Sequence, residues 1–445
     1  MNVGGTLIAG PASSGLSGTL TIPGDKSMSH RAIMLASLAD GITDIHGFLP
    51  GDDCLATAQM FVAMGVRIDW LNDEKTSLKV YGVGLHGLKK PTDILEAGNS
   101  GTCVRLMMGI LAAQPFDCVL SGDSSLQKRP MKRVADPLRK MGANITGEHD
   151  LLPLTIHGSP LHGIHHTSKI ASAQVKSCIL FAGLYAQGET TITEPRPSRD
   201  HTERMLPLFG QSIDVDTQCV IHLQATGKLT APTEPIYIPA DPSSACFFAV
   251  AASLIPDSQI TLKSIGMNPL RNGWQRILSD MGADLTLQHS TIVGKEEVAD
   301  IHISHQRLHA IDVHPADVPD AIDEFPAMFA AASLAEGTFK LTEATELRVK
   351  ESDRIAVMST ALRLAGADIE EFPDGAHVLG GTLKGGVTID AHGDHRIAMS
   401  MAVAAQCAES DICIKNAATI TTSFPDFVPL AQLLGMNVHW DEVER

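Results

Sequence analysis

The sequence predicts an α/β protein of two similar halves, each built from three repeats. One observation is an apolar helix with a polar first turn, a design that occurs six times. These first turns lie near Lys26, Asn99, Gln174, Ser243, Asp320 and Asp394. A near-constant spacing of roughly 70 to 80 residues along a whole chain indicates internal repeats. The other observation is a second helix that follows each of these and ends in glycine before a short strand, as in Met64-Gly65-Val66 and Met141-Gly142-Ala143.

The first repeat shows this design most clearly. A Pro23-Gly24 turn leads into Lys26, Ser27 and Arg31, and an apolar run over 32–39 follows. A helix N-terminus attracts anions through its free N–H groups and its dipole, and a lysine and serines strengthen that attraction. Such a first turn can also be only the solvated end of a core helix. Its repetition along the chain is what favours an anion-binding site.

The composition is that of a large soluble enzyme. The 445 residues suffice for two or more domains, and 44% of them are hydrophobic, which is enough for a core. The 51 acidic and 34 basic residues give a net charge of −17. This charge excludes broad binding to nucleic acid or to an anionic membrane. An anionic substrate must therefore be held by a local group of lysines and arginines.

The cysteines and histidines indicate a cytosolic protein without a metal. The eight cysteines include no Cys-x-x-Cys pair and lie mostly in apolar runs, so we expect reduced, buried thiols. His162, His165 and His166 have no carboxylate or cysteine at ligand spacing, which favours surface histidines. The N-terminus lacks the layout of a signal peptide and the apolar runs are interrupted, so we expect no membrane span.

The first half can be followed in order. Residues 1–22 are expected to form a short strand pair joined by a glycine-containing turn. In the second repeat, Gly101 permits a ligand to approach the backbone closely. The basic loop 121–133 contains Arg129, which can bind an anion or simply lie in solvated surface. The third repeat ends near Ala240, and this point is the natural domain boundary.

The second half carries more charge at its helix starts. Pro319-Asp320 is predicted to open one helix, and Arg396 lies at the start of another. In the segment 346–354, three charged side chains fall in adjacent turns, namely Lys350, Glu351 and Arg354. This pattern suits a phosphate or carboxylate site beside an acid, although a capping segment with local ion pairs has the same composition.

Seven motifs, in order, resemble those of the EPSP synthase (3-phosphoshikimate 1-carboxyvinyltransferase) family. They are Asp25-Lys26-Ser27 with Arg31, Asn99-Ser100-Gly101-Thr102 with Arg105, Arg129-Pro130-Met131, Ser172-Ala173-Gln174, Pro319-Asp320, Arg348-Val349-Lys350-Glu351-Ser352-Asp353-Arg354 and Asp394-His395-Arg396. The resemblance covers the whole chain. The Ser-Ala-Gln form and Ser198-Arg199-Asp200-His201-Thr202 resemble the second of the family's two sequence classes.

This resemblance implies a two-domain inside-out α/β barrel. Each domain would contain three βαβαββ repeats, with buried helices inside and sheets outside. The N-terminal domain would span 23–240, and the C-terminal domain would combine 1–22 with 241–445. The active site would lie in the cleft between them.

The resemblance also implies a reaction. The enolpyruvyl group of phosphoenolpyruvate would move to the 5-hydroxyl of shikimate 3-phosphate, giving 5-enolpyruvylshikimate 3-phosphate and phosphate. This step belongs to the shikimate pathway to chorismate and the aromatic amino acids. The enzyme would be a cytoplasmic monomer without metal or organic cofactor, and its partners would be the two small substrates. Glyphosate would occupy the phosphoenolpyruvate site.

Residue roles follow from the same resemblance. Phosphoenolpyruvate would be bound by Lys26, Gly101, Arg129, Gln174, Arg354 and Arg396. Shikimate 3-phosphate would be bound by Lys26, Ser27, Arg31, Ser172, Ala173, Gln174, Arg199, Asp320 and Lys350. The catalytic residues would be Lys26, Asp320 and Glu351, with Glu351 exchanging the proton at C3. One departure is Thr422, which stands where many first-class members carry a lysine, so the phosphoenolpyruvate site has one cation fewer.

Two alternatives stay open from the sequence. The sister enolpyruvyl transferase acts on a nucleotide sugar, but it carries Lys-Asn where this chain has Lys26-Ser27, and a loop cysteine that 121–133 does not contain. A non-catalytic binder of phosphorylated metabolites would explain the cations. It would not explain the acids Asp320 and Glu351, which can divide acid and base roles.

Overall fold

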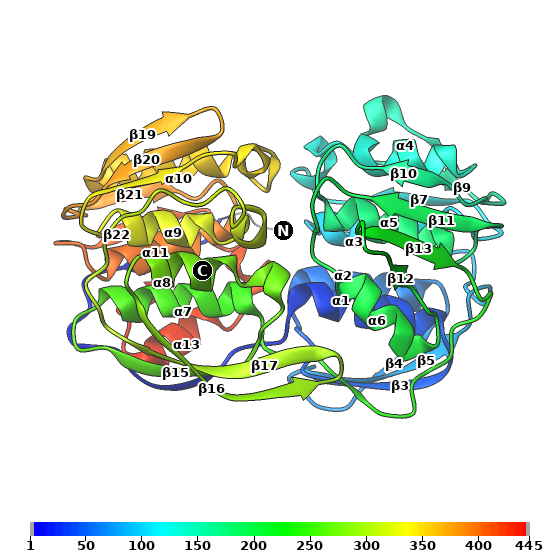
Figure 1. Ribbon diagram of the computed structural model, residues 1–445, viewed down its shortest axis with the longest axis horizontal. Coiled ribbons are helices and arrows are strands. Elements are labelled where there is room, and N and C mark those ends of the chain that lie inside the picture. Colours follow the sequence, from blue (N-terminus) through cyan, green and yellow to red (C-terminus); the bar gives the residue numbers. More distant parts are fainter. Residues whose placement is uncertain (1–3, 442–445) are drawn as a thin grey trace. The chain divides into compact units, whose positions relative to one another are not determined.

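The computed structural model describes residues 4–441, and these residues fold into two compact units. One unit is continuous and spans Gly24–Ile238. The other joins the segment that ends at Pro23 to the segment that begins at Pro239. The chain therefore leaves the discontinuous unit early and returns to it after the continuous unit is complete (Figure 1).

Residues 4–441 form six sheets, and their shared topology is the structural form of the predicted repeat. The continuous unit has three four-stranded sheets, in the orders β14-β3-β5-β4, β6-β7-β9-β8 and β10-β11-β13-β12. In each sheet the first pair is parallel and the other two are antiparallel. The strands are β3 (Asp40–His46), β4 (Arg67–Trp70), β5 (Ser77–Val83), β6 (Leu95–Glu96), β7 (Cys118–Ser121), β8 (Asn144–Thr146), β9 (Leu154–His157), β10 (His165–Thr167), β11 (Glu189–Thr193), β12 (Asp214–Val215), β13 (Val220–Gln224) and β14 (Ile236–Tyr237).

The discontinuous unit repeats this topology. Its sheets β16-β17-β15-β2 and β21-β22-β1-β23 each contain one parallel pair and two antiparallel pairs. The sheet β18-β20-β19 has three strands, and the isolated parallel bridge between Asp312 and Lys340 lies where the other sheets have a parallel strand. The strands are β1 (Leu7–Ala9), β2 (Ser17–Thr21), β15 (Gln259–Gly266), β16 (Asp284–Val293), β17 (Glu296–Ser304), β18 (Thr338–Leu341), β19 (Asp368–Phe372), β20 (Gly375–Leu379), β21 (Val387–Asp390), β22 (Ile412–Lys415) and β23 (Val438–Trp440).

The expectation that residues 1–22 form a strand pair is wrong. β1 lies between β22 and β23, whereas β2 pairs with β15 in another sheet. Both strands are short and find their partners far along the chain. A turn signal between them therefore does not reveal their pairing.

The helices form the interior of each unit. Helices α1, α3 and α5 are buried along most of their length in the continuous unit, and so are α7, α9 and α11 in the other unit. The remaining helices are buried along only part of their length or are short. Their bounds are α1 (Lys26–Leu38), α2 (Asp52–Ala63), α3 (Gly101–Leu111), α4 (Lys132–Lys140), α5 (Ala173–Gly183), α6 (His201–Met205), α7 (Pro242–Leu254), α8 (Gly273–Asp280), α9 (Phe325–Ala332), α10 (Arg354–Ala365), α11 (His395–Ala405), α12 (Ile420–Ser423) and α13 (Phe427–Leu434).

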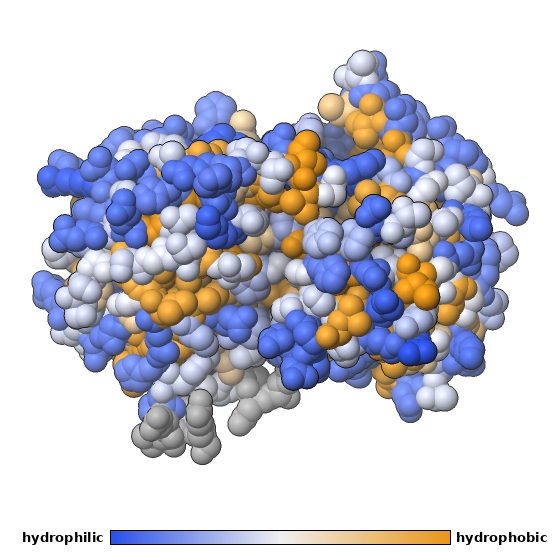
Figure 2. Space-filling view, turned by 90° about the horizontal axis from the view of Figure 1, so that it is seen from below, coloured by the Kyte–Doolittle hydropathy of each residue, from blue (hydrophilic) through white to orange (hydrophobic). Residues whose placement is uncertain are grey.

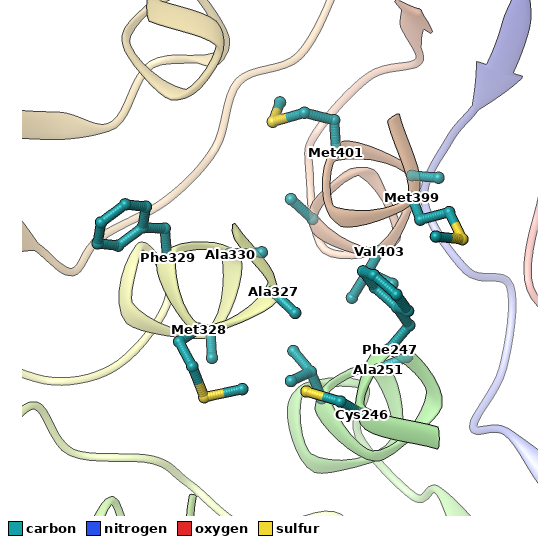
Figure 3. Packing of buried hydrophobic residues seen from close by; sticks show 14 of the residues in the cluster. Cys246, Phe247, Ala251, Ala327, Met328, Phe329, Ala330, Met399, Met401 and Val403 are labelled. Carbon is teal, nitrogen blue, oxygen red and sulfur yellow. The ribbon is translucent and has the colours of Figure 1, made fainter. Parts of the chain in front are cut away.

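Helices α7, α9 and α11 show how this interior packs. Figure 3 places Phe247 of α7, Ala327 of α9 and Val403 of α11 in the space that the three helices share. All three side chains are almost fully buried. Such helices are apolar on every face because each contacts neighbours all round. Helices inside and sheets outside therefore confirm the predicted inside-out α/β fold.

Polar caps fix where the buried helices begin. The carboxylate of Asp25 accepts a hydrogen bond from Met28 N at 2.8 Å, and Ser100 Oγ accepts one from Cys103 N at 3.2 Å. Ser172, Asp353 and Asp394 cap α5, α10 and α11 in the same way. An N-cap side chain satisfies one of the free N–H groups of the first turn. The caps thus place the following polar residues at helix N-termini.

The helices are short compared with a membrane span. Among residues 4–441 the longest helices, α1 and α7, have 13 residues each, whereas a membrane span needs about 20. Within residues 4–441, no helix is long and apolar enough to cross a membrane. The face drawn in Figure 2 intersperses hydrophilic with apolar residues.

Helix α3 lies directly against the backbone of α5 at Gly109. A Cβ atom there would lie 2.2 Å from the carbonyl oxygen of Cys178. We predict that Gly109→Ala lowers the free energy of unfolding by about 1–3 kcal/mol, although alanine favours helix by about 1 kcal/mol. Urea unfolding measures the change. Gly381→Ala is the control, because nothing lies within 4 Å of its added Cβ; equal stabilities of the two variants would contradict the prediction.

Candidate active site

The first turn of α1 presents Lys26 beside an acid. Lys26 Nζ lies 3.1 Å from the Oδ2 atom of Asp53, which is in the first turn of α2. The lysine side chain is 20% exposed, so the ammonium group is fixed but still partly accessible. A lysine held in this way is a point charge available to an anion.

Arg31, one turn further along α1, joins three helices. The side chain is 2% exposed. Its Nε donates to Thr202 Oγ1 of α6 and its Nη2 to Ser177 Oγ of α5, both at 2.7 Å. Its Nη1 donates to the carbonyl oxygen of Ser27 at 2.9 Å. Arg31 therefore fixes the backbone of Ser27 against α5 and α6.

The start of α3 brings three predicted phosphoenolpyruvate ligands together. A Cβ atom on Gly101 would lie 3.0 Å from Arg105 Nη1 and 3.5 Å from Arg129 Nη1. Arg105 Nη1 also donates to Gln174 Oε1 at 2.6 Å, and Gln174 Nε2 donates to Thr102 Oγ1 at 3.0 Å. Arg129 and Gln174 thus lie close to the bare backbone of Gly101 at the start of α3.

The start of α5 is tied to the loop that carries Arg199. Glu194 accepts a hydrogen bond from the backbone N–H of Ser172 at 3.1 Å. The same carboxylate accepts from Ser198 N at 3.2 Å and from Ser198 Oγ at 2.7 Å. Ala173 opens α5 directly after Ser172, and the half-buried Arg199 follows Ser198. Glu194 therefore ties the segment before Arg199 to the start of α5.

A buried cation supports this arrangement. Lys176, which is 2% exposed, lies 3.1 Å from Glu194 and 2.7 Å from Glu203. Burial alone would lower the pKa of Lys176, but the two carboxylates outweigh it and the pKa is raised. Burial also raises the pKa of Glu203, and Lys176 offsets only part of that effect. The sequence interpretation missed all three residues, because nothing local marks a lysine in the first turn of an apolar helix as a buried ion-pair partner.

In the discontinuous unit, Arg354 is the centre of the charged cluster. Its side chain is 1% exposed, and it opens α10. Its guanidinium group lies 2.9 Å from Asp394, 3.3 Å from Asp323 and 2.5 Å from Glu351. Burial would lower the pKa of Arg354, but these carboxylates raise it. The pKa of Asp394 is lowered although burial opposes this, because Arg354 faces it.

Lys350 and Arg396 complete this cluster around Asp323. Lys350 Nζ lies 3.1 Å from the carboxylate of Asp323. Arg396 Nη1 donates to the backbone oxygen of Asp323 at 2.8 Å and lies 3.4 Å from Glu324 Oε1. The structure therefore brings Lys350, Glu351, Arg354 and Arg396 together, as a shared anion site requires.

Within this unit, Asp320 belongs to a different ion-pair group from Asp323. It lies in a 3-10 turn, η5 (Pro319–Ala321), and its Oδ2 accepts from Arg276 Nη2 at 2.6 Å. The Nε of Arg276 pairs with Asp317 at 2.6 Å. Helix α9 begins only at Phe325, and the two acids before it are Asp323 and the N-cap residue Glu324. In the other repeats, too, polar residues lie just before the apolar run.

Two further sequence predictions concern Thr422 and metals. Thr422 lies in α12 and its hydroxyl donates to the carbonyl oxygen of Thr419 at 2.7 Å. His165 and His166 lie in the short strand β10. Across 4–441 there is no group of three or more His, Cys, Asp or Glu side chains that could hold a metal ion.

Solved structures first define the class of protein. The enolpyruvyl transferase NikO from Streptomyces tendae superposes with a TM-score of 0.79, covers 98% of this chain and 99% of its own, and is 14% identical. An EPSP synthase from Acinetobacter baumannii superposes with a TM-score of 0.87, covers 98% of this chain and 100% of its own, and is 46% identical. The fold is that of the enolpyruvyl transferases.

Sequence comparison then defines the family. The model of EPSP synthase (3-phosphoshikimate 1-carboxyvinyltransferase) matches residues 11–430. A 3-phosphoshikimate 1-carboxyvinyltransferase from Coxiella burnetii (strain RSA 493 / Nine Mile phase I) is 51% identical over 96% of both chains. One from Xanthomonas oryzae pv. oryzae (strain PXO99A) is 50% identical over 95% of both. The chain belongs to the EPSP synthase family, and the resemblance predicted from its motifs is confirmed.

The Lys176 cluster gives a stability prediction with a defined pH dependence. Lys176→Met leaves Glu194 and Glu203 buried without their cation, so we predict a loss of about 3–5 kcal/mol in the free energy of unfolding at pH 7.5. Without Lys176, the pKa of Glu203 in the folded state rises further above its ordinary value. An acid whose pKa is raised by folding destabilises the folded state once the pH exceeds its pKa in the unfolded state. The loss of unfolding free energy caused by Lys176→Met should therefore be smaller at pH 5 than at pH 7.5.

Urea unfolding of both proteins at the two pH values measures this difference. Lys132→Met is the matched control, because Lys132 pairs with Asp136 on the surface with 68% of its side chain exposed. It should change stability by less than about 1 kcal/mol at either pH. A loss of equal size at pH 5 and pH 7.5 for Lys176→Met would contradict the prediction.

Proposed function

We propose that this protein transfers the enolpyruvyl group of phosphoenolpyruvate to the 5-hydroxyl of shikimate 3-phosphate, releasing phosphate. The observation that carries the proposal is the cluster of Lys350, Glu351 and Arg354 around Asp323, in a chain of this family. It combines cations that suit phosphate and carboxylate groups with two carboxylates of different surroundings. A site of this kind can bind anions and also move a proton.

The cations divide between two anionic substrates. In this proposal, phosphoenolpyruvate is held by Lys26, Gly101, Arg129, Gln174, Arg354 and Arg396. Shikimate 3-phosphate is held by Lys26, Ser27, Arg31, Ser172, Ala173, Gln174, Arg199 and Lys350. Arginine forks bind carboxylate and phosphate in a bidentate manner, and the N–H groups of α3 and α5 add to the attraction. The proposal requires both units to present these groups to the same pair of substrates during turnover.

Glu351 and Asp323 perform the proton transfers. Glu351 donates a proton to C3 of phosphoenolpyruvate, which makes C2 electrophilic. The 5-hydroxyl adds to C2 while Asp323, held by Lys350, accepts its proton, and a tetrahedral ketal phosphate results. Phosphate then leaves with the proton that Asp323 accepted, and Glu351 takes a proton from C3, which gives the enolpyruvyl product. Asp323 thus takes the role that the sequence interpretation gave to Asp320.

The proposal is tested by an assay of phosphate release. Phosphoenolpyruvate and shikimate 3-phosphate together should release phosphate, and either substrate alone should not. Release with a nucleotide sugar in place of shikimate 3-phosphate would support the sister reaction instead. Binding of both substrates without any release would identify a non-catalytic binder.

We further propose that the enzyme works as a cytoplasmic monomer without nucleic acid or membrane partners. The net charge of −17 supports this, because it opposes broad association with polyanions. Size-exclusion chromatography with light scattering gives the mass in solution. A measured mass near twice 47.3 kDa would show that the protein is a dimer and not a monomer.

The assignment of the two carboxylates gives a direct kinetic prediction. Asp323→Asn and Glu351→Gln keep the shape of each side chain but remove its acid–base function, so each should lower kcat by about 10²–10⁴. Asp320→Asn is the matched control and should retain kcat within a few fold. Steady-state kinetics with both substrates decides the matter. If Asp320→Asn lowers kcat strongly while Asp323→Asn does not, the catalytic role belongs to Asp320 and not to Asp323.

Gly101 gives a prediction for inhibition by glyphosate, which we place in the phosphoenolpyruvate site. The backbone of Gly101 is bare, so the longer inhibitor can lie against it and the wild-type enzyme should be sensitive. A methyl group there would contact Arg105 at 3.0 Å and crowd the inhibitor more than the shorter substrate. Gly101→Ala should therefore raise the inhibition constant more than KM for phosphoenolpyruvate.

Steady-state inhibition kinetics on both forms measures the two constants. The variant should fold, because alanine favours helix over glycine by about 1 kcal/mol and Gly101 is not among the glycines of positive φ. If the wild-type enzyme stays active at glyphosate concentrations far above its KM for phosphoenolpyruvate, the claim of sensitivity is refuted. Equal changes in the two constants would refute the role of the methyl group.

A further inference from the structure

Asp123, which has no part in the proposed mechanism, lies behind Arg129. Its Oδ2 atom accepts a hydrogen bond from Asn99 Nδ2 at 2.7 Å. Asn99 Oδ1 in turn accepts one from Arg129 Nη2 at 2.7 Å. The side chains of Asp123, Asn99 and Arg129 therefore form a continuous chain from the loop after β7 to a proposed phosphoenolpyruvate ligand.

The amide of Asn99 has one satisfied orientation in this chain. A guanidinium group only donates hydrogen bonds, and an ionised carboxylate only accepts them. The amide oxygen must therefore face Arg129, and the NH₂ group must face Asp123. If Asp123 were an amide instead, Asn99 could turn over and present its NH₂ group to Arg129.

Asp123 also fixes the backbone that leads to Arg129. Its Oδ1 atom accepts from Ser125 N at 3.0 Å and from Leu126 N at 2.8 Å. These bonds form the first turn of η1 (Leu126–Lys128), and Arg129 follows as its C-cap. The two oxygens of one carboxylate thus hold both the backbone before Arg129 and the amide that receives its side chain.

These hydrogen bonds orient Arg129 through a neutral group, the amide of Asn99. Arg129 is 9% exposed, so its direction matters for any anion that reaches it. The amide oxygen of Asn99, which accepts the hydrogen bond from Arg129, carries no net charge, and the charged carboxylate of Asp123 lies one side chain further away.

We propose that Asp123 is a positioning residue that acts through Asn99 on Arg129 and so sets the affinity for phosphoenolpyruvate. This inference rests on the proposed function, in which Arg129 binds that substrate. A merely structural residue would affect both substrates alike or the stability alone. A positioning residue for Arg129 affects phosphoenolpyruvate selectively.

The test is a double-mutant cycle between Asp123→Asn and Asn99→Ala. Loss of an oriented hydrogen bond to a charged group should raise KM for phosphoenolpyruvate about tenfold in Asp123→Asn, with KM for shikimate 3-phosphate unchanged. Because the effect of Asp123 passes through Asn99, adding Asp123→Asn to the Asn99→Ala variant should raise KM for phosphoenolpyruvate little further. A rise that is equal for both substrates, or fully additive in that background, overturns the proposal.

Asp216→Asn is the matched control. Its carboxylate also accepts two backbone N–H groups, from Gln218 at 2.8 Å and Val220 at 2.9 Å, in a turn of the same unit. It should leave both KM values unchanged. If Asp123→Asn does not fold, Asn99→Ala carries the test alone, and an unchanged KM for phosphoenolpyruvate in that variant overturns the proposal.

Arg129→Gln separates this inference from the proposed function. If it raises KM for phosphoenolpyruvate while Asp123→Asn does not, the positioning role fails and the proposed function stands. If Arg129→Gln leaves that KM unchanged, the assignment of Arg129 fails and the inference fails with it. Thermal unfolding of every variant shows whether a kinetic change reflects loss of folded protein.

Discussion

The discontinuous unit depends on the neutralisation of one buried guanidinium group. Moving a charge such as that of Arg354 out of water costs several kcal/mol unless paired charges and hydrogen bonds offset it. Asp394 caps α11, Asp323 precedes α9, and Glu351 precedes α10. The charge of Arg354 therefore fixes three helix starts relative to one another. The proposed acid and base are two of the groups that stabilise it, so under this proposal folding and function use the same carboxylates.

Among the buried arginines, some have hydroxyl or amide partners and others have carboxylate partners. In the continuous unit, hydroxyl and amide oxygens accept from Arg31, Arg105 and Arg129. In the other unit, carboxylates accept from Arg354 and Arg271. Neutral partners orient a cation without cancelling its charge, which suits the binding of anions. Carboxylates cancel part of that charge, but they also supply groups that can move protons.

The fold was largely predictable because its signals are local. A polar first turn, an apolar run and a terminal glycine each depend on neighbours in sequence, and they recur in every repeat. Pairings between distant residues were not predictable in this way. The partners of β1 and β2, the burial of Lys176 between Glu194 and Glu203, and the ion pair of Lys350 with Asp323 all depend on segments that meet only in the folded chain.

The discontinuous unit has a consequence for synthesis on the ribosome. β1 pairs Leu7 with Ile414, and β2 pairs Leu20 with Leu262, so the first strands are made long before their partners. At about 5–20 residues per second, the chain between Pro23 and Pro239 takes on the order of ten to forty seconds to emerge. During that time the continuous unit can complete its three sheets, while β1 and β2 wait as an unpaired N-terminal segment. Their short length limits the exposed strand edge that a second nascent chain could pair with.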